Sequence, residues 1–212
     1  MPFDRECLLF VIPLVVVALA LFLFGLAKPA WAVVALAAFV LFFFRDPSRV
    51  IPADEDLIVA PADGKVIRID SSYQNDDFPD GAVCVSIFLS IFNVHVQRSP
   101  IAGTVATKKY NKGLYLAAWN HKASEDNESN LTIFDTSIGK VGVKQIAGLV
   151  ARRVVTRVNV GQTLAKGEHI GLIRFGSRVD LILPQDVELV SKMGDKVSGG
   201  STVMARIKVK AD

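Results

Sequence analysis

The sequence is poor in the residues that define several common classes of protein. It has two cysteines among 212 residues, Cys7 and Cys84, and they form no spacing pattern of a disulfide framework. We therefore expect reduced thiols, as in a cytoplasmic setting. Lysine and arginine (24) barely outnumber aspartate and glutamate (21), and there is no dense basic stripe with interleaved aromatic residues. These absences argue against a disulfide-stapled secreted domain and against nucleic acid as a partner.

Long apolar runs are present, but only near the N-terminus. Hydrophobic residues make up 51% of the chain and the mean hydropathy is +0.38, which is high for a wholly soluble protein. The excess lies in runs over 7–26 and 30–44, separated by Lys28-Pro29. A signal peptide has a shorter apolar core that ends at a small-residue cleavage site. Because each run approaches the roughly 20 residues that cross hydrocarbon, we expect a helical hairpin, spanning or embedded.

Basic residues flank this hairpin more than they mark its corner. Arg5 precedes the first run, Arg45 and Arg49 follow the second, and only Lys28 lies between them. The positive-inside rule then predicts both ends on the cytoplasmic side of a cell membrane. We expect residues 1–44 to be a membrane hairpin that anchors the remainder of the chain.

Residues 45–212 have the pattern of a β-rich domain. Strand patterns, with alternating or continuous apolar residues between turn signals, occur at 57–59, 66–69, 83–92, 105–110, 131–134, 140–146, 150–155, 169–174 and 179–183. The polar stretches 75–81 and 120–130 are expected to be loops. Two similar segments, 160–168 and 193–201, carry glycines at matching positions, as in the turns of lipoyl- and biotinyl-carrying barrels. We predict a mainly β, barrel-sandwich (lipoyl/biotinyl-like) fold behind the hairpin.

The pair Gly176-Ser177 lies between two strand patterns, without the Asn, Asp or Pro that accompanies most tight turns. Its serine hydroxyl can attack the preceding carbonyl and move the acyl group from nitrogen to oxygen. Elimination of the resulting ester would split the chain and leave dehydroalanine, which hydrolyses to a pyruvoyl group. A simple turn is the alternative, and the dipeptide alone does not decide between them.

Six short motifs occur in a fixed order along the chain: Phe44-Arg45-Asp46-Pro47, Pro61-Ala62-Asp63-Gly64-Lys65-Val66, Phe92-Asn93-Val94-His95-Val96, Asn120-His121, Asn127-Glu128 and Phe175-Gly176-Ser177. With this order and spacing, the chain resembles the short bacterial and archaeal branch of the phosphatidylserine decarboxylase family over nearly its whole length. The resemblance implies a proenzyme that cuts itself between Gly176 and Ser177 into a β chain, 1–176, and an α chain, 177–212.

The resemblance also implies a cofactor and a substrate. The cofactor would be the pyruvoyl group derived from Ser177, with neither a metal nor pyridoxal phosphate. It would form a Schiff base with the amine of membrane phosphatidylserine, whose decarboxylation gives phosphatidylethanolamine. The two chains would stay together as a heterodimer, and a higher homo-oligomer stays open.

The catalytic residues follow from the family and from general chemistry. A serine hydroxyl needs a base, histidine suits that work near neutral pH, and a carboxylate can fix the tautomer of the histidine. The family has such an Asp-His-Ser arrangement, which corresponds here to Asp63, His95 and Ser177. His95 or His121 would supply the proton that completes decarboxylation, and His169 is expected at the surface. Taken alone, Asp63 would be a turn residue and His95 a buried structural histidine.

Two other functions fit parts of the sequence. A non-enzymatic, membrane-anchored lipoyl-like adaptor would share the glycine turns, and Lys192-Met193 partly resembles a carrier-lysine turn. A decarboxylase of a related serine phospholipid, archaetidylserine, would share the head group and the mechanism. An intact mass separates the adaptor from the proenzyme, because only the proenzyme becomes two chains.

Overall fold

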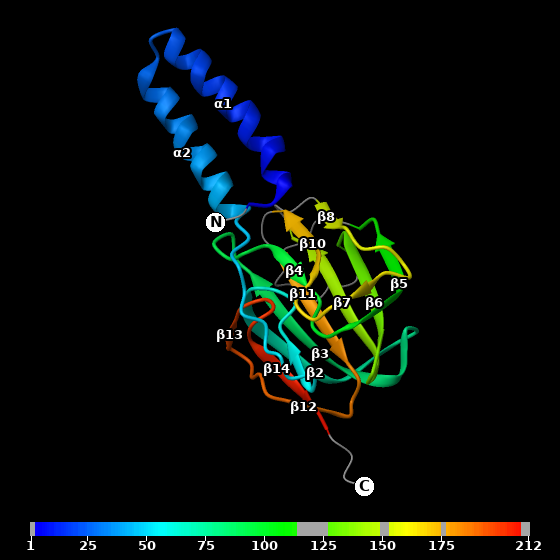
Figure 1. Cartoon of the computed structure of the whole chain (residues 1–212). Coiled ribbons are helices and arrows are strands. Elements are labelled where there is room, and N and C mark those ends of the chain that lie inside the picture. The colour runs from blue at the N-terminus through cyan, green and yellow to red at the C-terminus, as the bar shows by residue number, and fades with distance from the viewer. Residues whose placement is uncertain (1–2, 114–126, 149–152, 175–176, 209–212) are drawn as a thin grey trace. The chain divides into compact units, whose positions relative to one another are not determined.

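The computed structural model describes residues 3–113, 127–148, 153–174 and 177–208. The chain divides into two compact units, Met1–Ser48 and Arg49–Asp212, which we call the hairpin unit and the β unit (Figure 1). The first is helical and the second consists of strands, so the predicted mainly β fold behind an apolar helical hairpin is confirmed.

The hairpin unit begins with a short 3-10 turn, Arg5–Cys7, followed by α1 (Leu8–Leu23) and α2 (Ala27–Phe43). The segment Arg5–Leu23 is long and apolar enough to cross a membrane by length and composition, whereas α2 is shorter. The corner is not at Lys28-Pro29, as expected, but at Gly25, whose φ of 75° favours glycine. Pro29 is accommodated in the first turn of α2, where a backbone N–H has no helical partner to lose.

The β unit contains short strands joined by turns. Their bounds are β1 (Leu57–Val59), β2 (Gly64–Asn75), β3 (Phe78–Leu89), β4 (Val96–Arg98), β5 (Gly103–Asn111), β6 (Ser129–Thr136), β7 (Gly139–Ala147), β8 (Arg153–Thr156), β9 (Thr163–Leu164), β10 (His169–Arg174), β11 (Ser177–Leu183), β12 (Val187–Leu189), β13 (Lys196–Val197) and β14 (Val203–Ile207). Most of the strands are short and contain β-branched residues. In the described residues they pair only in antiparallel fashion.

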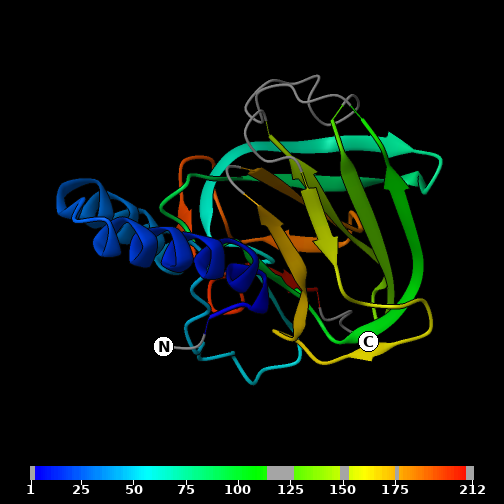
Figure 2. The ribbon, with the colours of Figure 1, turned by 90° about the horizontal axis from the view of Figure 1, so that it is seen from above.

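An eight-stranded sheet forms the body of this unit, in the order β13-β2-β3-β11-β7-β6-β5-β9. It curls into a half-barrel, whose curvature can be followed in Figure 2. Two three-stranded sheets, β4-β10-β8 and β1-β14-β12, accompany it. Fully buried residues such as Ile87, Val143 and Leu181 supply the core. Strand β11 lies between β3 and β7, and this central position places Ser177, its first residue, inside the sheet.

The two similar glycine-containing segments form matching turns. Each holds a two-residue strand, β9 or β13, between glycines with positive φ. A Cβ added to Gly167 or to Gly200 would come within 2.5 or 2.9 Å of the Ile51 side chain. Both turns therefore pack closely against the same isoleucine, at positions where a side chain larger than glycine's would clash.

Two expected loops are shorter than predicted. The segment 75–81 is mostly strand, because Asn75 Oδ1 accepts hydrogen bonds from the N–H groups of Asp77 and Phe78 and closes a tight β2–β3 turn. In the segment 120–130, Ser129 and Asn130 already belong to β6, and residues 120–126 lie outside the described part. Polar composition misled the first prediction because the Asn75 side chain bonds to the protein itself, and at the end of the second segment Asn130 Nδ2 donates to the Thr132 hydroxyl.

Candidate active site

Ser177 is the first residue of β11 and is fully buried. It lies opposite Leu89 at the end of β3 and opposite Ala147 at the end of β7. Its Oγ has no hydrogen-bond partner among the described residues. Leaving a buried hydroxyl unpaired costs about 1–3 kcal/mol, so such a group calls for a chemical reason. Gly176, on the other side of the predicted cleavage site, lies outside the described residues.

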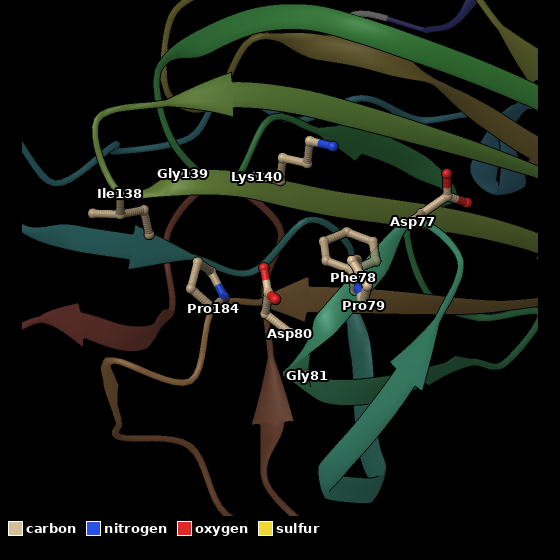
Figure 3. Close-up of a pocket in the computed structure, with 9 residues that line it drawn as sticks. All are labelled: Asp77, Phe78, Pro79, Asp80, Gly81, Ile138, Gly139, Lys140 and Pro184. Carbon is tan, nitrogen blue, oxygen red and sulfur yellow. The ribbon is translucent and has the colours of Figure 1, made fainter.

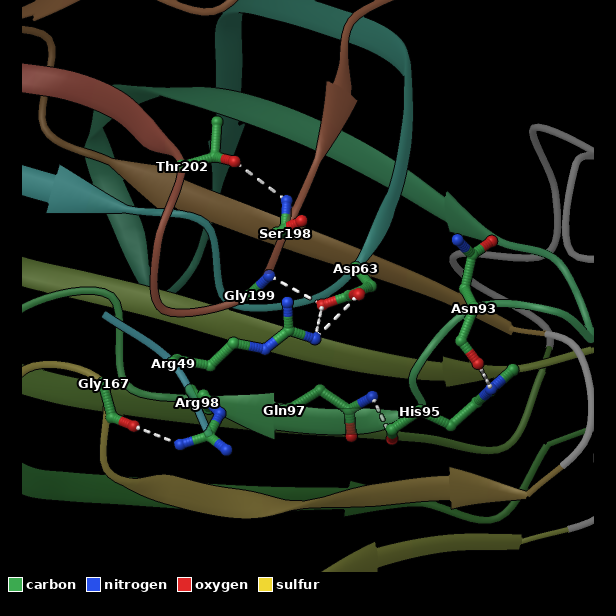
Figure 4. A network of polar contacts seen from close by, with 10 residues as sticks. All are labelled: Arg49, Asp63, Asn93, His95, Gln97, Arg98, Gly167, Ser198, Gly199 and Thr202. Carbon is green, nitrogen blue, oxygen red and sulfur yellow. Dashed lines mark hydrogen bonds and ion pairs between the residues drawn. The ribbon is translucent and has the colours of Figure 1, made fainter. Parts of the chain in front are cut away.

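His95 is buried, at 2% exposure, immediately before β4. Its Nδ1 lies 3.0 Å from the backbone oxygen of Asn93 (Figure 4). Because a carbonyl only accepts, Nδ1 carries the hydrogen, and the lone pair of the neutral ring is on Nε2. The Asn93 side chain is itself held, since its Oδ1 accepts from the N–H and the hydroxyl of Ser90 at 2.9 and 2.7 Å. The local turn therefore fixes a tautomer whose Nε2 can act as a base.

Asp63 lies at the start of the Asp-Gly turn before β2, but its hydrogen bonds do not lead to His95. Its two carboxylate oxygens accept from Arg49 Nη2 at 2.8 and 2.9 Å, and Oδ1 also accepts from the Gly199 N–H at 2.8 Å (Figure 4). The Arg49 and Asp63 side chains are 13% and 14% exposed. Among the described residues, Asn93 and not Asp63 orients the His95 ring. Sequence reasoning missed the contribution of Arg49 and Gly199.

The opposite face of β11 holds a buried ion pair next to the site. Arg178 Nε and Nη2 donate to the two oxygens of Asp180 at 2.6 and 2.9 Å, and both residues are 3% exposed. Buried charges are tolerated when paired in this way. Burial, and next to it Asp180, raises the pKa of the Cys84 thiol, while burial raises the pKa of Tyr73 to about 12. Residues alternate between the two faces of β11, with Ser177 on one face and Arg178 on the other. This alternation is the sequence signal from which the ion pair could have been predicted.

The remaining candidates are placed as follows. His121 lies outside the described residues, and His169 is exposed at the start of β10. No group of three or more His, Cys, Asp or Glu side chains in the described part of the chain could hold a metal ion. An open pocket of about 350 Å³ lies beyond the far end of β11, beside Pro184 (Figure 3). Asp77, Asp80 and Lys140 line it, and none of the predicted catalytic residues does.

Fold and site together define a half-barrel β domain, preceded in the sequence by an apolar helical hairpin, with a buried serine at the start of its strand β11 whose hydroxyl has no hydrogen-bond partner among the described residues. The family model described as phosphatidylserine decarboxylase matches residues 36–205. The chain belongs to the phosphatidylserine decarboxylase family, as its motifs predicted.

Named relatives agree with this assignment. A phosphatidylserine decarboxylase proenzyme of Magnetococcus marinus is 47% identical over 82% of this chain and 81% of its own length. A protein of that name from Burkholderia pseudomallei is 43% identical over 87% of this chain and 84% of its own. A putative archaetidylserine decarboxylase proenzyme of Methanothermobacter thermautotrophicus is 44% identical over 91% of this chain and 92% of its own length.

Proposed function

We propose that this chain is a proenzyme that cuts itself between Gly176 and Ser177 and then decarboxylates phosphatidylserine to phosphatidylethanolamine. The observation that carries the proposal is the Ser177 hydroxyl, fully buried and without a hydrogen-bond partner among the described residues, at the family's Gly-Ser junction. A nucleophile needs its oxygen available, and the Gly-Ser junction distinguishes Ser177 from Ser86 and Ser191, whose buried hydroxyls are also unpaired within the described part of the chain. Family membership favours this enzyme over a non-enzymatic adaptor.

Self-cleavage begins when His95 Nε2 takes the Ser177 hydroxyl proton and Oγ attacks the Gly176 carbonyl carbon. The C–N bond breaks as its nitrogen takes a proton, which leaves an ester between the two residues. Removal of the Ser177 Cα proton then breaks the Cβ–O bond and releases the Gly176 carboxylate. Water replaces the nitrogen of the dehydroalanine that remains, with loss of ammonia, and residue 177 becomes a pyruvoyl group.

The surroundings of Ser177 suit a pyruvoyl group at this position. Apolar neighbours, Leu89 and the small Ala147, face it from both flanking strands, and the unpaired Oγ has no protein bond to give up when it leaves. When formed, the group supplies an electron sink for the electrons left by loss of carbon dioxide. The residues of the chain exclude water and deliver the final proton, and we assign that delivery to His95 or His121.

We propose that the two chains remain one molecule after cleavage. Strand β11 of the α chain, residues 177–212, is hydrogen-bonded on both sides to strands of the β chain, residues 1–176. Strand β14 pairs with β1, and β13 pairs with β2. Asp63 also accepts from Gly199 across the two chains, so we assign Asp63 and Arg49 to holding this junction in place.

The hairpin unit brings this domain to its lipid substrate in our proposal. Its first helix has the length and apolar composition of a membrane span, and basic residues flank the hairpin. We therefore propose a cell-membrane location, with the β unit on the cytoplasmic side.

An intact mass of the purified protein tests the proposal. For the wild type we expect two masses, those of residues 1–176 and of residues 177–212 with a pyruvoyl group in place of Ser177. For Ser177→Ala we expect the mass of a single uncut chain. An active wild-type protein recovered wholly uncut would contradict it.

Archaetidylserine is the second candidate substrate, because the archaeal relative that bears this name is 44% identical over 91% of the chain. The serine head group is common to both lipids, so the difference lies in the ether-linked backbone. Parallel assays with the two lipids at equal surface concentration distinguish them. We expect phosphatidylserine to be turned over faster, and the reverse order would reassign the substrate.

A further inference from the structure

Two buried glutamines connect the strand next to His95 with the sheet that carries Ser177. Gln97 lies in β4 and Gln145 in β7, and both are fully buried. Gln97 Nε2 donates to the backbone oxygen of His95 at 2.7 Å (Figure 4). Gln145 Nε2 donates to Gln97 Oε1 at 2.8 Å, and the Thr156 hydroxyl donates to Gln145 Oε1 at 2.9 Å. A row of three hydrogen bonds thus ends on His95.

The His95 carbonyl fixes the direction of every bond in this row, because a carbonyl only accepts. Gln97 must turn its Nε2 toward that carbonyl and its Oε1 toward Gln145. Gln145 must then turn its own Nε2 toward Gln97 and its Oε1 toward Thr156. A hydroxyl can donate or accept, so Thr156 fits the last position. Buried hydrogen bonds aligned in one direction reinforce one another, and removing one weakens the rest.

The row crosses between two sheets. Gln97 and Thr156 belong to the sheet β4-β10-β8, whereas Gln145 belongs to the eight-stranded sheet. Gln145 lies opposite Val179 of β11, and Ala147, two residues further along β7, lies opposite Ser177. Residues opposite one another, or two apart along a strand, share a face of a sheet. Gln145 and Ser177 therefore lie on the same face, and the row links that face to the backbone of His95.

We propose that Gln145 and Gln97 are positioning residues for self-cleavage, which fix the His95 backbone relative to Ser177. The inference rests on the proposed role of His95 as the base. The Ile173 N–H also donates to the His95 oxygen, at 3.2 Å, while Asn93 holds the ring from the other side. Backbone and ring are thereby held separately. Loss of the glutamine row leaves the tautomer intact and loosens only the placement of the imidazole.

Gln145→Glu tests this with a hydrogen bond that pH can restore. Glutamate has the shape of glutamine, but its carboxylate only accepts and cannot donate to Gln97 Oε1, whereas the protonated carboxyl can. Burial raises the pKa of a carboxyl group, so protonation falls within a workable pH range. We expect cleavage about tenfold slower than wild type near pH 8, with the ratio rising toward one near pH 5.5. Gln145→Leu should be slowed by a similar factor at every pH.

The full-length chain is synthesised in a cell-free lysate with vesicles of phosphatidylglycerol and phosphatidylethanolamine. Synthesis is then stopped, the sample is moved to buffers of different pH, and cleavage is followed on denaturing gels. Whatever pH dependence the wild-type reaction has is common to both proteins, so dividing by the wild-type rate at each pH removes it. Gln97→Glu is the second variant, and the same recovery at low pH is expected. Wild-type cleavage by Gln145→Glu near pH 8 would overturn the inference.

Asn130→Asp is the matched control. Asn130 lies opposite Gln145 on the neighbouring strand β6, is 2% exposed, and donates to Thr132 rather than to the row. The same change of charge at the same depth should not reproduce the recovery at low pH. If it does, buried charge and not positioning is the cause. His95→Ala separates the two proposals: cleavage at the wild-type rate would contradict the role of His95 as base. An uncut His95→Ala beside a fully active Gln145→Glu would contradict only the positioning role.

Discussion

The hairpin unit and the β unit use the same kinds of side chain in opposite ways. Leu9 and Leu23 of the hairpin are 62% and 87% exposed, whereas Ile87 and Leu181 of the β unit are fully buried. Burying a leucine or isoleucine side chain is favourable by about 1.5–3 kcal/mol, so the β unit has its own source of stability. The exposed apolar side chains of the hairpin gain this burial free energy only in apolar surroundings. This difference is what our proposal of separate anchoring and catalytic parts of the chain rests on.

The largest effect expected in the β unit comes from a single oxygen. Ser177→Ala removes the only atom that can attack the Gly176 carbonyl in our proposal, so cleavage and decarboxylation should both be abolished. Denaturing gels and a lipid assay check this. Membrane association should stay at the wild-type level, because the hairpin unit is unchanged. Loss of membrane binding along with cleavage would break the separation of the two units.

Apolar substitutions should separate the units next. Ile87→Ala should lower the free energy of unfolding by about 2–5 kcal/mol, because it leaves a cavity in the core. Leu9→Ala, a matched loss of apolar side chain at an exposed hairpin position, should change it by less than about 0.5 kcal/mol. Urea unfolding in detergent micelles, in the uncut Ser177→Ala protein, measures both. Equal losses would show that the two units share one core.

His95 should distinguish processing from turnover within the β unit. His95→Ala should accumulate uncut, whereas His95→Gln should mature slowly and yield some pyruvoyl enzyme. We expect turnover per pyruvoyl group to fall by about 10²-fold, typical for loss of a general acid–base. Single-turnover assays normalised to the pyruvoyl content measure this. Wild-type turnover per group would assign the decarboxylation proton to another residue, with His121 next.

The smallest effect is expected from removing the hairpin. A chain that begins at Arg49 retains the Arg49–Asp63 ion pair and should still fold and cut itself. Activity on phosphatidylserine in bilayers should fall by about tenfold, because the effective concentration of substrate is lost. Activity on a short-chain, soluble analogue should stay near the wild-type level. A chain that begins at Val50 is the control, since it lacks the ion pair. Equal losses of activity on both substrates by the chain that begins at Arg49 would contradict the separation of the hairpin unit from the β unit.

Much of the fold was predictable because its signals are local. The apolar runs predicted both helices, and the strand patterns of apolar residues predicted β10 and most of β5 and β7. The matching glycines at 161, 167, 194 and 200 predicted paired turns, and each has positive φ. The errors came where side-chain hydrogen bonds and packing override composition. The β2–β3 turn is tighter than expected because Asn75 bonds to it, and Phe78 enters a small second core.

The site was predictable only in part. The motifs named Ser177 and His95, and both side chains are buried. The motifs gave no sign that Asp63 bonds to Arg49 and to Gly199, because those partners come from distant parts of the chain. Gln97 and Gln145 have unremarkable sequence contexts. Their significance appears only when two sheets bring them together, 48 residues apart in the chain.

The pairing of β11 between β3 and β7 has a consequence for the lifetime of the mature enzyme. The proenzyme folds as one chain, and its central strand reaches its place by a unimolecular search. If the chain is cut between Gly176 and Ser177, as we propose, this strand becomes part of a separate 36-residue peptide (177–212), and refolding after denaturation becomes a bimolecular, concentration-dependent reaction. We would then expect the two pieces to stay together through slow unfolding rather than through easy reassembly. On this proposal, assembly is efficient once, before the cut, and the working life of a dilute molecule is set by the time to its first unfolding.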